Sequence, residues 1–247
     1  LKMTKNQSNK EYLQLLIHSG VDFFTKNQPN DLFATIEKNN LTHKPQNNII
    51  LPEIKTINDL KTFVDSSLKC SLKKTANKTV IGDGNPNADL MIIGEAPGKD
   101  EDEKGLPFVG RAGQLLTKML MAINLDRKNI YVTNAIPWRP PNNRTPTEKE
   151  ILECLPFLQK IIEIIQPKII FLLGATATKA ILSTPLALSK LRGKWHQFKT
   201  INMEKNVDVL VSYHPAYLLR SPQYKKEAWI DLKKLQIKIK NENENEN

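Results

Sequence analysis

LMIIGEAPG, residues 90 to 98, is an apolar run that ends in a turn rich in glycine and proline. Four consecutive apolar residues are typical of a strand buried on both faces, as in a parallel sheet. Gly94 and Gly98 allow a sharp turn whose N–H groups can face a ligand, while Glu95 projects from the strand end. Taken alone, the same residues also fit an ordinary strand-to-helix turn before a solvated acidic run.

Three further apolar runs follow along the chain: Ile130–Asn134, Ile169–Leu173 and Val207–Ser212. Segments with helical spacing lie between the runs, over Gln114–Ile123, Thr147–Ile165 and Ala175–Leu182. This alternation favours an α/β fold with helices on both faces of the sheet. We therefore predict a three-layer αβα domain with a central, mostly parallel four-stranded sheet, and ligands at the carboxyl ends of its strands.

The length of 247 residues predicts one catalytic domain with extensions at both ends. Residues 1–60 are rich in Asn and Lys and carry one short helical pattern, so we predict a partly helical extension. The catalytic domain is predicted over residues 61–238. Asn and Glu alternate in the last residues, so we predict a disordered tail over 239–247.

The chain is basic and poor in cysteine. Lys and Arg outnumber Asp and Glu by 36 to 26, a formal net charge of +10. This excess favours a nucleic-acid partner, although a general lysine bias would produce it too. Two cysteines give no disulfide framework, and no apolar run approaches the ~18 residues of a membrane span. We predict a cytoplasmic monomer without membrane contact.

Polar side chains follow the second and fourth predicted strands. Asn134 can present a donor and an acceptor to a base edge, and the proline-rich loop after it carries Arg139 and Arg144 for phosphates. A capping asparagine and a stiff surface loop are the alternative. His214, followed by Pro215 after the fourth strand, is well placed to donate to an anionic leaving group.

Five segments carry these features in order: GEAPG at 94–98 with Glu101 and Asp102, GLPFVGRAG at 105–113, Thr133-Asn134, RPPNNR at 139–144 and HPAYLLR at 214–220. Together they resemble the family 4 uracil-DNA glycosylases, from about Thr75 to Leu235. The resemblance implies a monofunctional enzyme of base excision repair. Such an enzyme flips uracil out of DNA and hydrolyses its N-glycosidic bond, which leaves an abasic site.

The resemblance also implies roles for single residues. Glu95 corresponds to the acidic residue that positions or activates the hydrolytic water, and His214 to the residue that stabilises negative charge on uracil O2. Phe108 corresponds to the aromatic that stacks on uracil, and Asn134 to the amide that reads its Watson–Crick edge. The predicted pocket is completed by Ala96, Gly98 and Glu101.

Glu101 is expected on the side of the pocket that excludes the thymine methyl, with a solvated charge as the alternative. Loops around the pocket are expected to hold DNA. Phosphate contacts are predicted at Arg111, Arg139, Arg144, Arg192, Lys194 and Arg220. Leu218 or Leu219 is predicted to fill the space that the flipped base leaves.

Many family 4 enzymes hold a four-iron cluster through four cysteines. Cys70 and Cys154 fall on two of these ligand positions, whereas Ser67 and Trp138 occupy the other two. We therefore expect no cluster and no other cofactor, with the two thiols as vestigial, buried apolar groups. A cluster shared between two subunits is the alternative.

Three other functions compete with this interpretation. A non-catalytic DNA-binding or replication-associated module would keep the pocket without turnover. An enzyme acting on free nucleotides is disfavoured because the first strand is not followed by a P-loop or Gly-x-Gly-x-x-Gly. A related branch cross-links itself to DNA through a histidine in an inserted loop, and no such insertion follows Asn134.

Overall fold

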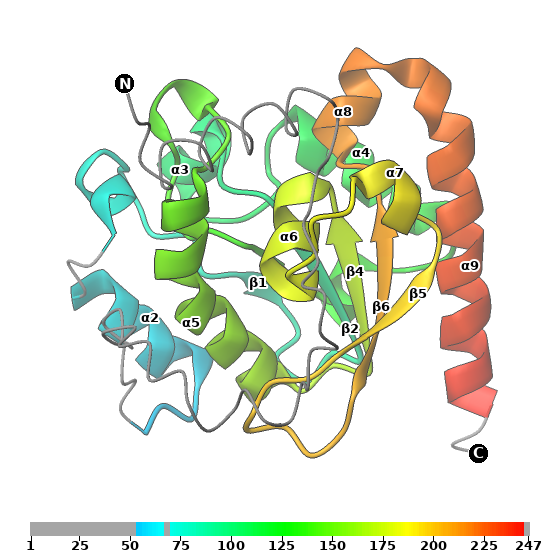
Figure 1. The fold of residues 1–247 in the computed structure, drawn as a ribbon, viewed down its shortest axis with the longest axis horizontal. Coiled ribbons are helices and arrows are strands. Elements are labelled where there is room, and N and C mark those ends of the chain that lie inside the picture. The colour runs from blue at the N-terminus through cyan, green and yellow to red at the C-terminus, as the bar shows by residue number, and fades with distance from the viewer. Residues whose placement is uncertain (1–52, 67–69, 245–247) are drawn as a thin grey trace, which may run out of the picture. The chain divides into compact units, whose positions relative to one another are not determined.

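The computed structural model describes residues 53–66 and 70–244, without the side chain at position 243 (Figure 1). Most of the predicted N-terminal extension lies outside these ranges. The predicted boundary at residue 60 falls inside helix α2, Ile57–Ser66. Within the described ranges, every helix is too short or too polar to cross a membrane.

Six strands form one mixed sheet in the order β1-β3-β2-β4-β6-β5. The four central strands are parallel and lie close to the predicted runs: β3 Tyr131–Asn134, β2 Leu90–Gly94, β4 Ile169–Leu173 and β6 Val207–Ser212. This confirms the predicted fold class. The sheet also has two antiparallel edge strands that we did not predict, β1 Asp83–Gly84 and β5 Trp195–Phe198.

Alternate residues of a strand point to opposite faces of the sheet, so the apolar central strands have two faces to bury. Helices cover both faces. Met91 and Ile93 pack in one core with α2, α5 (Glu148–Ile165) and α6 (Ala175–Leu182). Leu90 and Ile92 pack in a second core with α4 (Arg111–Met121), α8 (Pro215–Arg220) and α9 (Lys225–Glu244). Shorter helical segments are α3 Lys99–Lys104, α7 Leu188–Leu191, η2 Ser71–Lys74, η3 Arg127–Asn129, η4 Pro141–Asn143 and η5 Pro222–Tyr224.

The ends of two helices follow from local chemistry. Thr147 and Glu150 form a capping box that starts α5, as the Thr-x-x-Glu pattern predicts. Helix α9 runs on to Glu244, so the prediction of a disordered tail is wrong for residues 239–244. Ion pairs one helical turn apart, Lys238 with Glu242 and Lys240 with Glu244, support this last part of the helix.

Candidate active site

A pocket of about 420 Å³ opens at the carboxyl ends of β2, β3 and β6. This is the edge of the sheet where ligands of open α/β folds bind. Its lining includes every residue predicted for the catalytic and uracil-binding roles: Glu95, Ala96, Gly98, Glu101, Phe108, Asn134 and His214. Residues distant in the sequence therefore converge on one cavity, as the motif order suggested.

Phe108 forms one wall of this pocket in a strained backbone conformation. Its φ is 53°, in the left-handed region that costs a bulky residue of this kind about 1 to 3 kcal/mol. The ring stacks on His214 with centroids 5.6 Å apart. A Cβ atom at position 94 would lie 2.7 Å from Phe108 Cε2 and 2.6 Å from Asn134 Oδ1, so only glycine fits there.

Glu101 and Arg127 hold the loop that carries Phe108 through hydrogen bonds to its backbone. Glu101 accepts hydrogen bonds from the N–H groups of Val109 (2.9 Å) and Gly110 (2.8 Å), and from that of Gly98 (3.1 Å). The Arg127 guanidinium donates to the carbonyl of Phe108 (2.7 Å) and to that of Pro107. Glu101 is thus a bound carboxylate rather than a solvated charge, and its contacts point to loop support.

Glu95 projects into the pocket from the turn after β2. One of its carboxylate oxygens, Oε2, accepts a hydrogen bond from the Thr176 hydroxyl at 2.6 Å. Thr176 lies in the first turn of α6 and is 5% exposed. The predictions from sequence missed this threonine, because nothing in the GATAT segment marks one hydroxyl as facing a carboxylate 81 residues away.

His214 caps the start of α8 and is fixed in one tautomer. Its Nδ1 accepts a hydrogen bond from the Ala216 N–H at 3.1 Å, so a neutral ring carries its proton on Nε2. Burial, with a smaller effect of nearby Arg220, lowers the pKa of His214 to about 4. At neutral pH the pocket therefore contains an uncharged imidazole that can donate through Nε2.

Asn134 ends β3 with its side chain buried at 4% exposure. Its Nδ2 donor has no hydrogen-bond partner among the described residues. An unpaired buried donor costs about 1 to 3 kcal/mol, a cost that a ligand oxygen at this point would remove. The pocket is therefore prepared for a ligand with an acceptor opposite this amide.

Three of the arginines predicted to contact phosphate are engaged within the protein. Arg192 is the clearest case, with hydrogen bonds to Asp231 and an ion pair to Glu227 at 2.9 Å. Arg144 binds both carboxylate oxygens of Glu150. Arg139 donates to Asn143 (2.7 Å). These contacts leave Arg192 with a structural role, and we withdraw it as a predicted phosphate contact.

The remaining predicted DNA contacts lie at the surface. Arg111, Lys194 and Arg220 are exposed, and Arg220 also lines the pocket. The two leucines predicted to fill the space that the flipped base leaves differ sharply in solvent exposure. Leu218 is 1% exposed and belongs to a core, whereas Leu219 is 37% exposed. Only Leu219 has the exposure needed to enter DNA.

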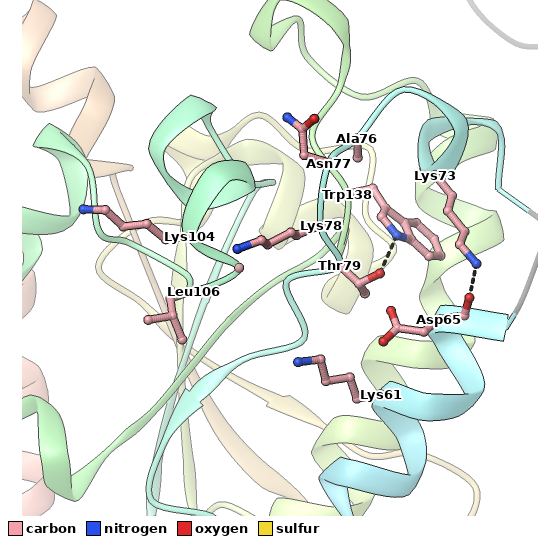
Figure 2. A pocket seen from close by; sticks show the side chains of 11 residues that line it. Lys61, Asp65, Lys73, Ala76, Asn77, Lys78, Thr79, Lys104, Leu106 and Trp138 are labelled. Atoms are coloured by element: carbon pink, nitrogen blue, oxygen red, sulfur yellow. Dashed lines mark hydrogen bonds between the residues drawn. The ribbon is translucent and has the colours of Figure 1, made fainter.

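A second hollow, of about 720 Å³, lies beside α2 and the end of α3. Figure 2 shows Lys61, Lys73, Lys78 and Lys104 around it, with the Trp138 indole donating to Thr79 Oγ1 at 3.0 Å. It is lined by none of the residues predicted to bind or cleave the substrate. The smaller pocket is therefore the candidate active site.

The fold and this pocket define an α/β enzyme that binds a planar, hydrogen-bonding ring beside a carboxylate and a neutral histidine. The chain belongs to the uracil-DNA glycosylase superfamily, whose family model matches residues 81–233. Within this superfamily the chain is similar to the type-4 uracil-DNA glycosylases of three organisms.

The relative from Sulfurisphaera tokodaii is 42% identical, over 73% of this chain and 84% of its own length. The relative from Archaeoglobus fulgidus is 40% identical, over 74% and 92%. The relative from Pyrobaculum aerophilum is 39% identical, over 70% and 89%.

We predicted that the protein has no iron–sulfur cofactor. The relationship to type-4 enzymes contradicts this prediction, because members of that family bind a four-iron cluster. Two of the four ligand positions do meet in the structure, where the Sγ atoms of Cys70 and Cys154 lie 3.8 Å apart. Their hydrogen bond lowers the pKa of Cys70 and, together with burial, raises that of Cys154.

The described residues do not supply the rest of a ligand set. Trp138 is 1% exposed and has no ligand atom, and Ser67 lies outside the described ranges. In the part of the chain that the structure describes, no three or more His, Cys, Asp or Glu side chains group closely enough to hold a metal. The mechanism below therefore uses only the side chains of the pocket.

Proposed function

We propose that this protein is a monofunctional uracil-DNA glycosylase of base excision repair. It flips uracil out of DNA and hydrolyses the N-glycosidic bond, which leaves an abasic site. One observation carries the proposal: a single pocket joins the Glu95 carboxylate, a neutral His214, the Phe108 ring and an unpaired Asn134 donor. The names of the similar type-4 enzymes support the same activity.

Phe108 and Asn134 bind the flipped base in this proposal. The uracil ring stacks on Phe108, and Asn134 Nδ2 donates to O4 while Oδ1 accepts from N3–H. Cytosine has the opposite donor and acceptor pattern at these two positions, so it would leave buried polar groups unpaired. The amide thereby selects uracil.

His214 and Glu95 act on the bond that breaks. His214 donates through Nε2 to uracil O2, where negative charge develops as the base departs. Glu95 orients the attacking water and stabilises the positive charge that develops on the deoxyribose. A neutral histidine can fill this role because Nδ1 accepts from the Ala216 N–H, so the one ring proton lies on Nε2.

DNA is held around the pocket by basic side chains, and Leu219 fills the space that the flipped base leaves. These basic side chains are Arg111, Arg139, Arg144, Lys194 and Arg220. We place catalysis in residues 61–238, with the N-terminal segment as an extension. We also propose a cytoplasmic location, since Cys70 and Cys154 are free thiols, as a reducing compartment would keep them. The proposed oligomeric state is a monomer.

The test is uracil release from a labelled single-uracil oligonucleotide by the wild type and by His214→Ala. We expect release by the wild type and a loss of about 100-fold or more in the variant, the range of one oxyanion donor. His196→Ala is the matched control, because His196 lies on β5 and bonds the Leu191 carbonyl outside the pocket. Folded wild type that binds DNA but releases no uracil would support the non-catalytic module instead.

A further inference from the structure

The Glu95 carboxylate has a specific hydrogen-bond donor. Thr176 Oγ1 lies 2.6 Å from Glu95 Oε2, and because a carboxylate only accepts, the hydroxyl is the donor. Within the described part of the chain, no other side chain forms a hydrogen bond or an ion pair with this carboxylate. The orientation of Glu95 in the pocket therefore depends on one buried hydroxyl.

Thr176 is itself held firmly. It is 5% exposed on α6, a helix that packs against β2 and β4 in the centre of the sheet. The helix begins directly after Gly174, whose φ of 91° few other residues would adopt. A β-branched side chain also has few rotamers in a helix. The hydroxyl is thus fixed by the core of the protein.

We propose that Thr176 is the positioning residue for hydrolysis: by holding Oε2, it turns the second oxygen of Glu95 toward the attacking water. This inference rests on the proposed glycosylase function and adds to it. Without the hydroxyl, the Glu95 side chain can rotate about its last bonds. Small departures from reactive geometry reduce rates strongly, even when substrate still binds.

Thr176→Val removes the hydroxyl and keeps the shape of the side chain. We expect its cleavage rate to fall about 10- to 100-fold in single-turnover experiments with saturating enzyme, as for the loss of a hydrogen bond to a charged group. The affinity for uracil-containing DNA should stay within about threefold of the wild type, since Thr176 does not line the pocket. Thr176→Ser, which restores the donor, should recover most of the rate.

Thr178→Val is the matched control on the same helix. Its hydroxyl is also buried, but it donates to the Gly174 carbonyl at 2.8 Å and not to Glu95. We expect a lower unfolding temperature and a cleavage rate close to that of the wild type. Should Thr176→Val fail to fold, Thr176→Ala tests the same hydroxyl with a smaller side chain.

Equal losses in Thr176→Val and Thr176→Ser would overturn the proposal, as would a wild-type rate in Thr176→Val. Failure of the function itself has a different signature. If the wild type releases no uracil, or if Glu95→Ala cleaves as fast as the wild type, the assignment of Glu95 is wrong. If Glu95→Ala is inactive and Thr176→Val cleaves at the wild-type rate, only the role proposed for Thr176 is wrong.

Discussion

His214 combines a fixed tautomer with a lowered pKa, and both follow from its place at the start of α8. The Ala216 N–H occupies Nδ1, and burial opposes a second proton. A pKa of about 4 keeps the ring neutral through the whole physiological range. If His214 stabilises the leaving base as proposed, its protonation should not limit activity in mildly acidic solution.

The same pKa predicts a dependence of stability on pH. The pKa of His214 is about 4 in the native state and 6.5 as the ordinary value. As the pH falls from 7 to 4, the unfolded chain binds a proton that the native state refuses, so the native state loses about 3 kcal/mol. Urea unfolding of the wild type and of His214→Gln at both pH values measures this loss. Equal losses in the two proteins would contradict the lowered pKa.

Single residues also mark the limit of prediction from sequence. Glu95, Asn134 and His214 could be predicted to line one pocket, because each stands at the end of an apolar run and within a recognisable motif. Thr176 and Arg127 could not, because each acts through a contact with a segment far along the chain. The ion pair of Arg192 could not be predicted, because its partner, the fully buried Asp231, lies in a helix that we had not predicted.

The loop that carries Phe108 is held as one element between Glu101 and Arg127. Arg127→Lys would keep the charge but replace the planar guanidinium, whose two terminal nitrogens each bond one carbonyl, by a single ammonium nitrogen that does not match this geometry. The strained Phe108 conformation should then relax, which removes the stacking wall. We expect KM for uracil-containing DNA to rise about 10-fold with a smaller change in kcat.

Steady-state kinetics of Arg127→Lys checks this expectation, with Lys128→Met as control. Lys128 is the exposed neighbour of Arg127, and its substitution should leave KM unchanged. A fall in kcat with constant KM would show that the loop orients the reacting groups rather than the base.

Elements with a continuous apolar run could be predicted, and those without one could not. β2 and β4 are buried on both faces, and no polar residue interrupts their sequences. β3 and β6 are also mostly buried, and apolar residues still dominate them although Thr133 and Asp208 occur within them. β1 has only two residues, and β5 alternates intermediate and exposed positions. Neither edge strand therefore contains an apolar run that would predict it. α9 did carry a signal that we overlooked, since Ala228, Leu232 and Leu235 recur at helical spacing beneath many charges.

The net charge of the whole molecule, +10, bears on how DNA affinity responds to salt. Each phosphate contact that is lost should reduce the slope of log K against log salt by about 1. Lys194→Gln and Arg220→Gln should each do so. Arg192→Gln should leave the slope nearly unchanged and destabilise the fold by about 3 kcal/mol or more, because Asp231 would lose its cation.

Fluorescence anisotropy on one duplex at several salt concentrations measures these slopes, and thermal unfolding measures stability. A reduced slope for Arg192→Gln in a fully stable protein would restore Arg192 as a DNA contact. A slope that Lys194→Gln leaves unchanged would remove Lys194 from the DNA surface.

Gly94 has a consequence for how base specificity can evolve. The space that a methyl group would need at this position is already taken by Phe108 and Asn134, the wall and the reader of the proposed base. A larger residue at 94 is tolerable only if both neighbours also change, and we expect each of those changes alone to weaken binding of the proposed base. Variants with a different base preference must therefore arise by paths that keep glycine at position 94.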